Sequence, residues 1–140
     1  MVYVDTSVLV ALYLNEDRSA AVSRWYAACT DELVSAVWCV SEFASALSIK
    51  MRTGQIGEAA IQTAWQQFES MCANDLVLLP LEPGTFHRAA LLTLDASSGI
   101  RAGDALHLAA ALDAKARSMA TLDDVLARNC RKLKLQLVPL

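Results

Sequence analysis

Five short apolar segments alternate with longer helix-forming segments along this chain of 140 residues. The short segments are typical of buried strands, whereas the longer ones repeat apolar residues every three or four positions, as amphipathic helices do. We predict strands at Val2–Val4, Leu33–Ser35, Leu76–Leu81, Met119–Ala120 and Leu135–Val138. We predict helices at Val8–Leu14, Arg18–Ala28, Val37–Arg52, Glu58–Cys72, Thr85–Leu94, Ala102–Ala116 and Asp124–Leu133. Strands separated by helices require right-handed crossovers, so the alternation predicts an α/β fold with a mostly parallel sheet of about five strands covered on both faces.

The whole chain, residues 1–140, is expected to form a single domain. Its mass of 15.1 kDa is sufficient for a core, and five glycines and three prolines leave no linker-like stretch. No apolar run approaches the roughly 18 residues that a membrane span needs. Asp5 also interrupts the apolar N-terminus, where a secretory signal would stay uncharged. We therefore expect a cytoplasmic protein that does not associate with membranes.

Charge and cysteine usage exclude several classes of site. The net charge of −3 gives no general attraction to nucleic acid, so any such binding must come from local basic patches or from metal ions. The cysteines form no C-x-x-C pair and have no histidine pairs nearby, which argues against a zinc site and a disulfide framework. We expect them to be reduced core residues: Cys29, Cys39, Cys72 and Cys130.

The opening run MVYVDTSVLVALYL places one carboxylate, Asp5, between a predicted strand and a predicted helix. A charge at such a buried junction costs several kcal/mol unless a partner compensates it. In an open α/β sheet, ligands bind beyond the carboxyl ends of the strands, and Asp5 lies at such an end. Two small hydroxyl residues, Thr6 and Ser7, follow it directly. The position of Asp5 is therefore that of a binding-site residue whose partner has to be found.

Three further acids occupy comparable positions. Glu42, in VWCVSEFASALSIK, lies on the apolar face of its predicted helix. Asp104, in RAGDALHLAAAL, lies in the first turn of its helix and on the same face as Leu108. Asp123, in MATLDDVL, follows a short predicted strand directly, as Asp5 does. All of these acids are expected on or beside buried faces.

Each acid taken alone has a purely structural explanation. Asp5 and Asp123 could cap helices, and Asp104 could complement a helix dipole. Glu42 could pair with a buried arginine. Taken together they have few cations to pair with, because most of the twelve basic residues lie in polar stretches. Mg²⁺ or Mn²⁺ would resolve the conflict, since these ions prefer oxygen ligands and one ion can be shared by several carboxylates.

The order and spacing of four motifs resemble those of the PIN-domain nucleases, and among them the VapC-type toxins of type II toxin–antitoxin pairs. The motifs are VDTSVLVAL, SEFASAL, RAGDALHLAAAL and TLDDVLARNCRKLKLQLVP, and they span nearly the whole chain. The resemblance implies a three-layer α/β/α PIN-like domain and a metal-dependent ribonuclease. It implies an acidic quartet that is both catalytic and metal-binding: Asp5, Glu42, Asp104 and Asp123. Asp123 is chosen over Asp124 because the family motif reads Thr, any residue, Asp.

The resemblance carries further expectations about the site and its partners. Thr6 or Ser7 and Thr121 would supply hydroxyls beside the acids. The cofactor would be Mg²⁺ or Mn²⁺, and the substrate RNA. The partners would be a cognate VapB-type antitoxin, which projects an Arg or Lys into the acidic site, and a second copy in a homodimer. Aromatic residues of two predicted helices, Arg18–Ala28 and Glu58–Cys72, suggest a surface for that dimer.

Other residues near the motifs have less specific interpretations. Arg101 precedes the Asp104 helix and is a candidate for binding RNA phosphates. A basic cluster near the C-terminus is equally well explained as a solvated face: Arg128, Arg131, Lys132 and Lys134. His107 lies inside an apolar helix and is predicted to be a hydrogen-bonded packing residue. The three tryptophans are predicted to be core or interface residues, although they could stack on bases: Trp25, Trp38 and Trp65.

Other functional classes fit less well. A haloacid-dehalogenase-type phosphatase needs a second acid two residues after the first, where this chain has Ser7. A receiver domain needs a phosphorylatable aspartate after its third strand, where the chain reads LPLEPG. The remaining alternative is a PIN fold that binds RNA or protein without turnover, and the presence of all four acids argues against it.

Overall fold

The computed structural model describes all residues from Met1 to Leu140. At its centre is a five-stranded sheet with the strand order β3-β2-β1-β4-β5, and every neighbouring pair is parallel. The strands are β1 (Val2–Val4), β2 (Leu33–Ala36), β3 (Leu76–Leu79), β4 (Ser118–Ala120) and β5 (Gln136–Leu137). The five predicted strands are confirmed, and the sheet is parallel throughout rather than only mostly parallel.

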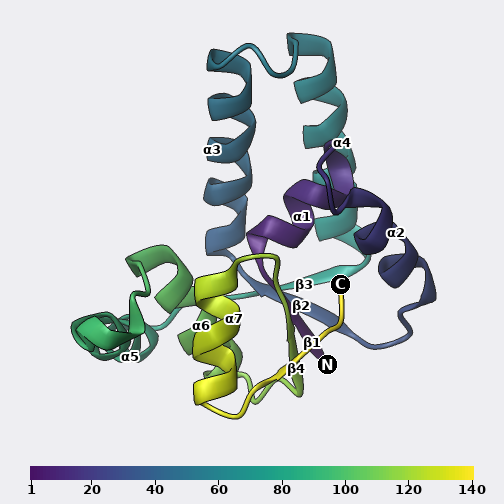
Figure 1. The fold of residues 1–140 in the computed structure, drawn as a ribbon. Coiled ribbons are helices and arrows are strands. Elements are labelled where there is room, and N and C mark those ends of the chain that lie inside the picture. Colours follow the sequence, from purple (N-terminus) through teal and green to yellow (C-terminus); the bar gives the residue numbers. More distant parts are fainter.

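Helices cover both faces of the sheet (Figure 1). They are α1 (Thr6–Tyr13), α2 (Ser19–Ala28), α3 (Trp38–Arg52), α4 (Glu58–Asn74), α5 (Pro83–Leu94), α6 (Ala102–Asp113) and α7 (Asp124–Lys132), with a 3₁₀ turn η1 (Ala96–Ser98). Helices α1 to α4 lie above the strands or to their right in Figure 1, and α5 to α7 lie to their left. The predicted three-layer α/β/α architecture is confirmed. No helix is both long enough and apolar enough to cross a membrane.

The two faces of the sheet carry two separate cores, because side chains alternate along each strand. Val2 and Val4 of β1 pack into one core with residues of α1 to α4. Tyr3, between them, packs into the other core with residues of α5 to α7. A strand buried on both faces is mostly apolar, which is why β1 reads VYV and β2 reads LVSA, in which Ser35 is the one buried polar residue.

Most predicted boundaries differ from those of the structure by one to three residues, and two of the differences have identifiable reasons. The first helix begins at Thr6 rather than Val8, since Asp5 caps it and accepts a bond from the backbone N–H of Ser7. Strand β3 ends at Leu79 rather than Leu81, where its pairing with β2 ends and Pro83 starts α5. The apolar run continues to Leu81 because that side chain packs into the core beneath the sheet.

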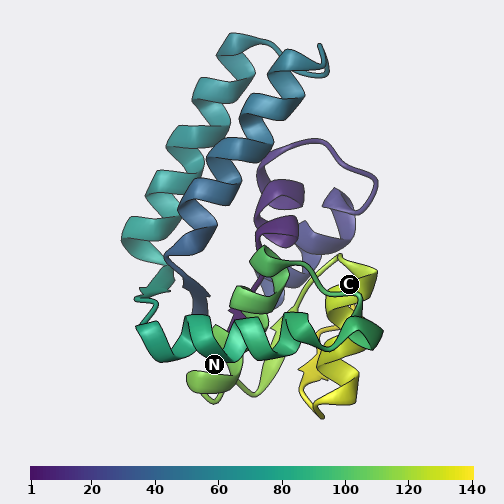
Figure 2. The same cartoon turned by 90° about the vertical axis from the view of Figure 1, so that its left-hand side faces the viewer.

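Helices α3 and α4 form a hairpin that extends beyond the three layers (Figure 2). Stacked rings of Phe43 and Phe68, with centroids 4.2 Å apart, join the two helices, and Trp65 packs against both rings. Phe68 is therefore a core residue with 1% of its surface exposed. The expectation that the aromatic residues of α2 and α4 form a free surface is wrong for Phe68, while Trp25 and Tyr26 are half-buried against the same core.

Candidate active site

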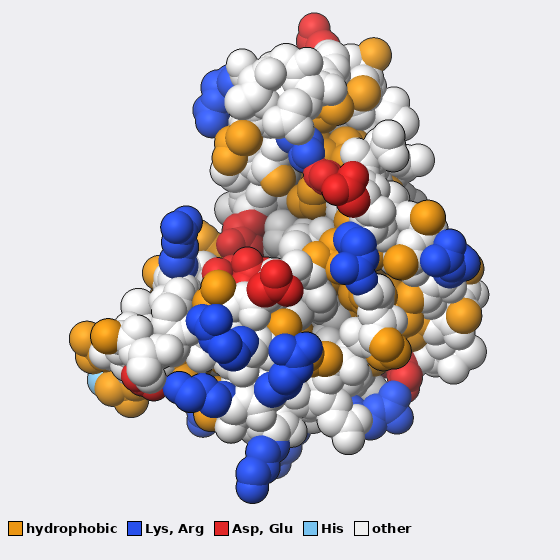
Figure 3. Space-filling model, viewed as in Figure 1, with side chains coloured by type: hydrophobic (Ala, Val, Ile, Leu, Met, Phe, Trp, Pro, Cys, Tyr) orange, Lys and Arg blue, Asp and Glu red, His pale blue; other side chains and the backbone are white.

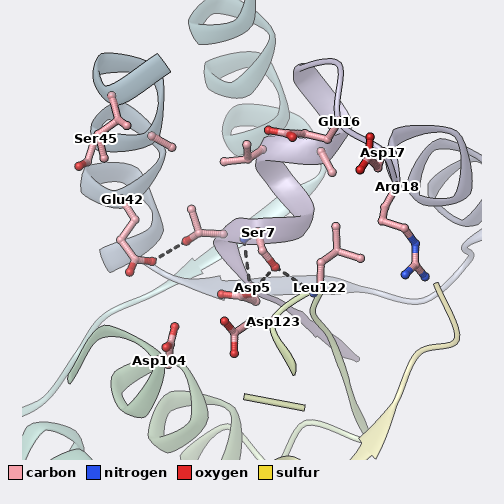
Figure 4. Close-up of a pocket in the computed structure, with 15 residues that line it drawn as sticks. Asp5, Ser7, Glu16, Asp17, Arg18, Glu42, Ser45, Asp104, Leu122 and Asp123 are labelled. Atoms are coloured by element: carbon pink, nitrogen blue, oxygen red, sulfur yellow. Dashed lines mark hydrogen bonds between the residues drawn. The ribbon is translucent and has the colours of Figure 1, made fainter. Parts of the chain in front are cut away.

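The four predicted acids come from four different elements and line one open cleft of about 550 Å³ (Figure 4). Asp5 follows β1 and Asp123 follows β4, and these two strands are neighbours in the sheet. Their carboxyl ends therefore deliver both side chains to the same edge. Glu42 reaches the cleft from α3, and Asp104 from the first turn of α6. The parallel sheet thus brings Asp5 and Asp123, which are 118 positions apart in the sequence, into one cleft.

Asp5 is held by three hydrogen bonds to one of its oxygens. Its Oδ2 accepts from the hydroxyl of Ser7 at 2.5 Å, from the hydroxyl of Thr121 at 2.9 Å and from the backbone N–H of Ser7 at 3.4 Å. The Ser7 hydroxyl in turn accepts from the backbone N–H of Leu122 at 2.9 Å. The other oxygen, Oδ1, accepts no hydrogen bond. Asp5 therefore has a fixed orientation and one free oxygen.

Glu42 is held in the same one-sided way. Its Oε2 accepts from the hydroxyl of Thr6 at 2.6 Å and is in close contact with Nε2 of His107. Burial would by itself raise the pKa of Glu42, but the hydrogen bond and the charge of His107 and the hydroxyl of Thr6 outweigh it, so this pKa lies below its usual value. Oε1 faces α6 and lies near the buried indole N–H of Trp38, which also lowers the pKa of Glu42.

The remaining two acids are held less firmly. Asp123 accepts from the backbone N–H of Leu126 at 2.6 Å through Oδ1 and thereby caps α7, which leaves Oδ2 free. Asp104 takes part in no hydrogen bond. Burial raises the pKa of Asp104 to about 6, and the nearby charges of Asp123, Asp5 and Glu42 add to this effect. The acid that has no hydrogen-bond partner is therefore one whose charge the site disfavours.

Two of the acids have the structural role that the sequence suggested, and this role leaves one oxygen of each available for a ligand. Asp5 and Asp123 do cap helices, but each uses only one oxygen to do so. The partner of Glu42 is not an arginine; it is His107 together with Thr6. As predicted, no arginine or lysine pairs with the four acids. The contact of His107 with two of them, Asp5 and Glu42, was not predicted.

His107 is fully buried and hydrogen-bonded, as predicted, and it also contacts the site. Its Nδ1 lies 2.8 Å from the hydroxyl of Tyr3, and its Nε2 lies 3.2 Å from the hydroxyl of Thr6 and 3.7 Å from Oδ1 of Asp5. Burial opposes protonation of the imidazole, but the hydrogen bond to Glu42 and the surrounding carboxylates outweigh it and raise the pKa of His107. The helical pattern in the sequence predicts that His107 is buried, but it does not predict which residues hydrogen-bond to Nδ1 and Nε2 of the ring.

The cleft extends past the four acids to a polar loop that was not predicted to line it. Glu16, Asp17 and Arg18, between α1 and α2, form its far wall, and Glu16 pairs with Lys50 of α3 at 2.5 Å. The run NEDRS, which follows the first helix directly, was the available signal. Arg101 is exposed and does not line the cleft.

Basic side chains surround the acidic hollow in Figure 3. Part of the C-terminal basic cluster has structural partners, because Arg128 donates to the carbonyl of Ser98 and Lys132 lies 3.6 Å from Asp95. Arg131 has no such partner and lines, with Arg18, a second cavity of about 420 Å³ that adjoins the cleft at Asp123. The solvated-face interpretation therefore applies to part of the cluster only.

The donor set fits a hard divalent cation held partly through water. No three side chains of the types His, Cys, Asp or Glu surround one point closely enough to bind an ion directly. Mg²⁺, however, commonly keeps several waters and binds through one or two carboxylates. Each of the four acids has at least one oxygen without a hydrogen bond, and all line the same cleft.

Comparison with known proteins identifies the family. The model of the PIN domain matches residues 2–132. This chain belongs to the PIN domain family. The predicted family is confirmed, and PIN domains are typically nucleases. No curated protein sequence matches the chain.

Solved structures share the PIN fold over nearly the whole chain. VapC20 from Mycobacterium tuberculosis, described as a sarcin-ricin loop cleaving toxin, has a TM-score of 0.75 and 14% identity, with 92% of this chain and 95% of that chain covered. FitAB bound to an IR36 DNA fragment has a TM-score of 0.70 and 15% identity, covering 99% and 94%. PAE2754 from Pyrobaculum aerophilum has a TM-score of 0.64 and 20% identity, covering 97% and 81%. At these identities the likeness concerns the fold.

Proposed function

We propose that residues 1–140 form one PIN domain that hydrolyses RNA phosphodiester bonds with Mg²⁺ or Mn²⁺ and acts in the cytoplasm as the toxin of a toxin–antitoxin pair. The observation that carries the proposal is the arrangement of the four acids. They line one cleft, each with a free oxygen, and no arginine or lysine neutralises them. His107, which contacts Glu42 and lies 3.7 Å from Oδ1 of Asp5, can balance at most one of the four charges.

In this proposal Asp5, Glu42, Asp104 and Asp123 hold the ion directly or through water. A bound ion supplies positive charge to the scissile phosphate and lowers the pKa of a water molecule. The chain itself supplies orientation: Ser7 and Thr121 fix Asp5, and Thr6 fixes Glu42. Asp104 and Asp123 keep oxygens that can accept the proton of an attacking water.

RNA binding is assigned to the basic residues around the cleft. Arg18 lines the cleft itself, and Arg131 lines the adjoining cavity. Arg101 lies at the start of α6, three residues from Asp104, with no side-chain partner, so it remains a candidate for a phosphate contact outside the cleft.

The proposed toxin role and the VapB-type antitoxin are supported by the fold that the chain shares with VapC20 and with FitAB. The four-acid cleft would attract a guanidinium or ammonium group of such a partner. Next to the acids, Val10, Ala11, Ala46 and Ile49 form an apolar part of the cleft against which a partner helix could pack. Induced alone, the protein is expected to arrest growth, and co-expression of the neighbouring reading frame is expected to relieve the arrest.

We also propose a homodimer, now on a different surface from the aromatic residues of α2 and α4. Helix α5 exposes three large apolar side chains: Phe86, Leu91 and Leu94, with 48%, 57% and 78% of their surface exposed. Phe86 and Leu94 border an apolar hollow of about 540 Å³ between α5 and α6. Such a patch is typical of an interface. Light scattering at tens of micromolar should give the mass of a dimer, and Leu94→Glu should give a monomer.

The activity is tested with a panel of tRNA, rRNA and mRNA fragments incubated with Mg²⁺, with Mn²⁺ or with EDTA. We expect cleavage at defined positions in the presence of either metal and none in EDTA, with the product ends identified by sequencing. Binding of RNA without cleavage under all three conditions would favour the alternative, a catalytically inactive PIN-fold binding module.

A further inference from the structure

The carboxylate of Glu42 is confined from two sides. On one side, Oε2 contacts Nε2 of His107 and the hydroxyl of Thr6. On the other side, Oε1 faces the backbone of Gly103 in the first turn of α6, where the indole nitrogen of Trp38 also lies. A Cβ atom at position 103 would lie 2.8 Å from Oε1, closer than real Cβ contacts allow.

The imidazole of His107 is itself fixed from behind. The hydroxyl oxygen of Tyr3 accepts the backbone N–H of Ala36 at 2.9 Å and lies 2.8 Å from Nδ1 of His107. In the neutral ring, the Tyr3 O–H donates to Nδ1, which places the ring proton on Nε2, where it faces Glu42. A continuous series of contacts therefore links the backbone of β2 to Glu42 through Tyr3 and His107.

This series of contacts explains why a polar residue, His107, lies in an apolar core. His107 is 0% exposed inside the core of α5 to α7, where an apolar residue would avoid the need for partners at both ring nitrogens. The ring is instead satisfied at both ends, and one of the two ends is a carboxylate of the cleft. A residue whose only role is packing has no reason to contact the same acid as Thr6.

We propose that His107 is a positioning residue of the active site: it holds Glu42, together with Thr6 and against Gly103, so that Glu42 offers only Oε1 to the cleft. The inference rests on the proposed function, because it treats Glu42 as a ligand of the proposed metal ion. Groups that hydrogen-bond a metal-binding carboxylate typically change metal affinity or activity 10- to 100-fold when they are removed. His107 and Gly103 then belong to the site although neither needs to touch the substrate.

Two substitutions of His107 separate positioning from packing. In His107→Gln, the amide nitrogen can take the place of Nε2 and donate to Glu42. In His107→Asn, the shorter side chain reaches the position of Nδ1, so it keeps the contact with Tyr3 and loses the one with Glu42. Both variants remove the buried ring, so both are expected to lower the melting temperature.

The decisive measurement is Mn²⁺ affinity by calorimetry on the folded, RNA-free protein, followed by kcat and KM for RNA. We expect His107→Asn to weaken Mn²⁺ binding about 10-fold or more and to lower kcat more than it raises KM, whereas His107→Gln recovers much of both losses. Equal Mn²⁺ affinity and kcat in the two variants would overturn the proposal, because the ring would then act only through packing. Mn²⁺ binding is measured without RNA, so the proposal can hold even if no RNA is cleaved.

Gly103→Ala provides a test that leaves the core intact. Alanine favours the helix relative to glycine by up to about 1 kcal/mol, so loss of folding is not expected. Its Cβ would displace Glu42 from His107 and Thr6, and Mn²⁺ affinity should fall as in His107→Asn. In His107→Asn/Gly103→Ala the losses should not add, because both act through Glu42. Full additivity, or wild-type Mn²⁺ affinity in Gly103→Ala, would contradict the proposed arrangement.

Discussion

The two halves of the acidic cleft differ in how firmly the protein holds their carboxylates. In the held pair, Asp5 and Glu42, one oxygen of each acid takes two or more contacts from hydroxyl, backbone or imidazole groups. In the open pair, Asp123 accepts one backbone bond and Asp104 accepts none. The pKa of Glu42 lies below its usual value, whereas that of Asp104 is raised to about 6. The negative charge is therefore stabilised at Glu42 and destabilised at Asp104.

This difference shows how the fold can prepare a cation site before a cation arrives. The held pair sets the orientation of the cleft through hydrogen bonds made during folding. The open pair keeps its oxygens available and carries the repulsion among the four charges. An ion that binds the open pair would relieve this repulsion, and its binding would therefore stabilise the folded protein.

The largest effect should come from removing one charge in either half. We expect Asp5→Asn and Asp104→Asn each to lower RNA cleavage by about 100-fold or more, since both would weaken the site electrostatically. Cleavage rates with Mg²⁺ on the best fragment of the RNA panel provide the measurement. Asp124→Asn, which changes an exposed acid outside the cleft, is the matched control. Full Mg²⁺-dependent activity of folded Asp104→Asn would exclude its assignment to the site.

The same two substitutions should change stability in opposite directions. Without metal, Asp104→Asn should raise the free energy of unfolding by about 1 kcal/mol, because it removes a half-buried charge that burial and the neighbouring carboxylates disfavour and that solvent partly screens. Asp5→Asn should lower it by about 1 to 2 kcal/mol, since three hydrogen bonds lose their charged acceptor. Urea unfolding in EDTA at pH 7 measures both. If both variants were stabilised equally, the distinction between held and open pairs would be wrong.

Removal of single hydroxyls should weaken the held pair while leaving all four charges in place. Thr6→Val keeps the shape of the side chain and removes one bond to Glu42, and we expect a loss of about 1 kcal/mol in stability. Ser7→Ala should cost more, about 2 kcal/mol, because it also leaves the backbone N–H of Leu122 without its acceptor. Urea unfolding of the two variants measures which of them loses more stability. A larger loss in Thr6→Val than in Ser7→Ala would contradict the expected order.

The smallest effect is the pH dependence that Asp104 contributes. Its pKa of about 6 in the folded protein lies above its usual value of 3.8, so the folded state binds the proton more tightly. The destabilisation is fully present above pH 6 and fades as the pH falls towards 4. The stability advantage of Asp104→Asn over the wild type in EDTA should shrink over this range. Carboxyl ¹³C NMR should show Asp104 titrating near pH 6, and titrating at lower pH after Mg²⁺ is added.

Much of the candidate site could be predicted from the sequence because local patterns placed its acids. Asp5 and Asp123 each follow a short apolar segment, so their positions at strand ends were predictable. Glu42 and Asp104 interrupt the apolar faces of helices. Thr6, Ser7 and Thr121 lie beside Asp5 or Asp123 in the sequence, but only Ser7 donates to the acid next to it; Thr6 donates to Glu42, and Thr121 donates to Asp5.

The contacts of these acids with distant residues could not be predicted in this way. His107 and Glu42 lie on helices from opposite sides of the sheet and meet only at its edge, so no local periodicity relates them. Gly103 reads as an ordinary glycine near a helix start, and its lack of a side chain matters only because Glu42 packs against it. Arg18 lines the cleft while Arg101 does not, which depends on the path of the loop after α1.

The sequence by itself determined the family, the order of strands and helices along the chain, and the four acids, because hydrophobic periodicity and motif spacing are local properties. The tertiary structure alone decided which oxygens are held and which are free. It also decided that the apolar surface lies on α5 while Phe68 is buried. The physical reason is that hydrogen bonds and side-chain burial depend on distances between segments far apart in sequence, and only the packed sheet and helices set those distances.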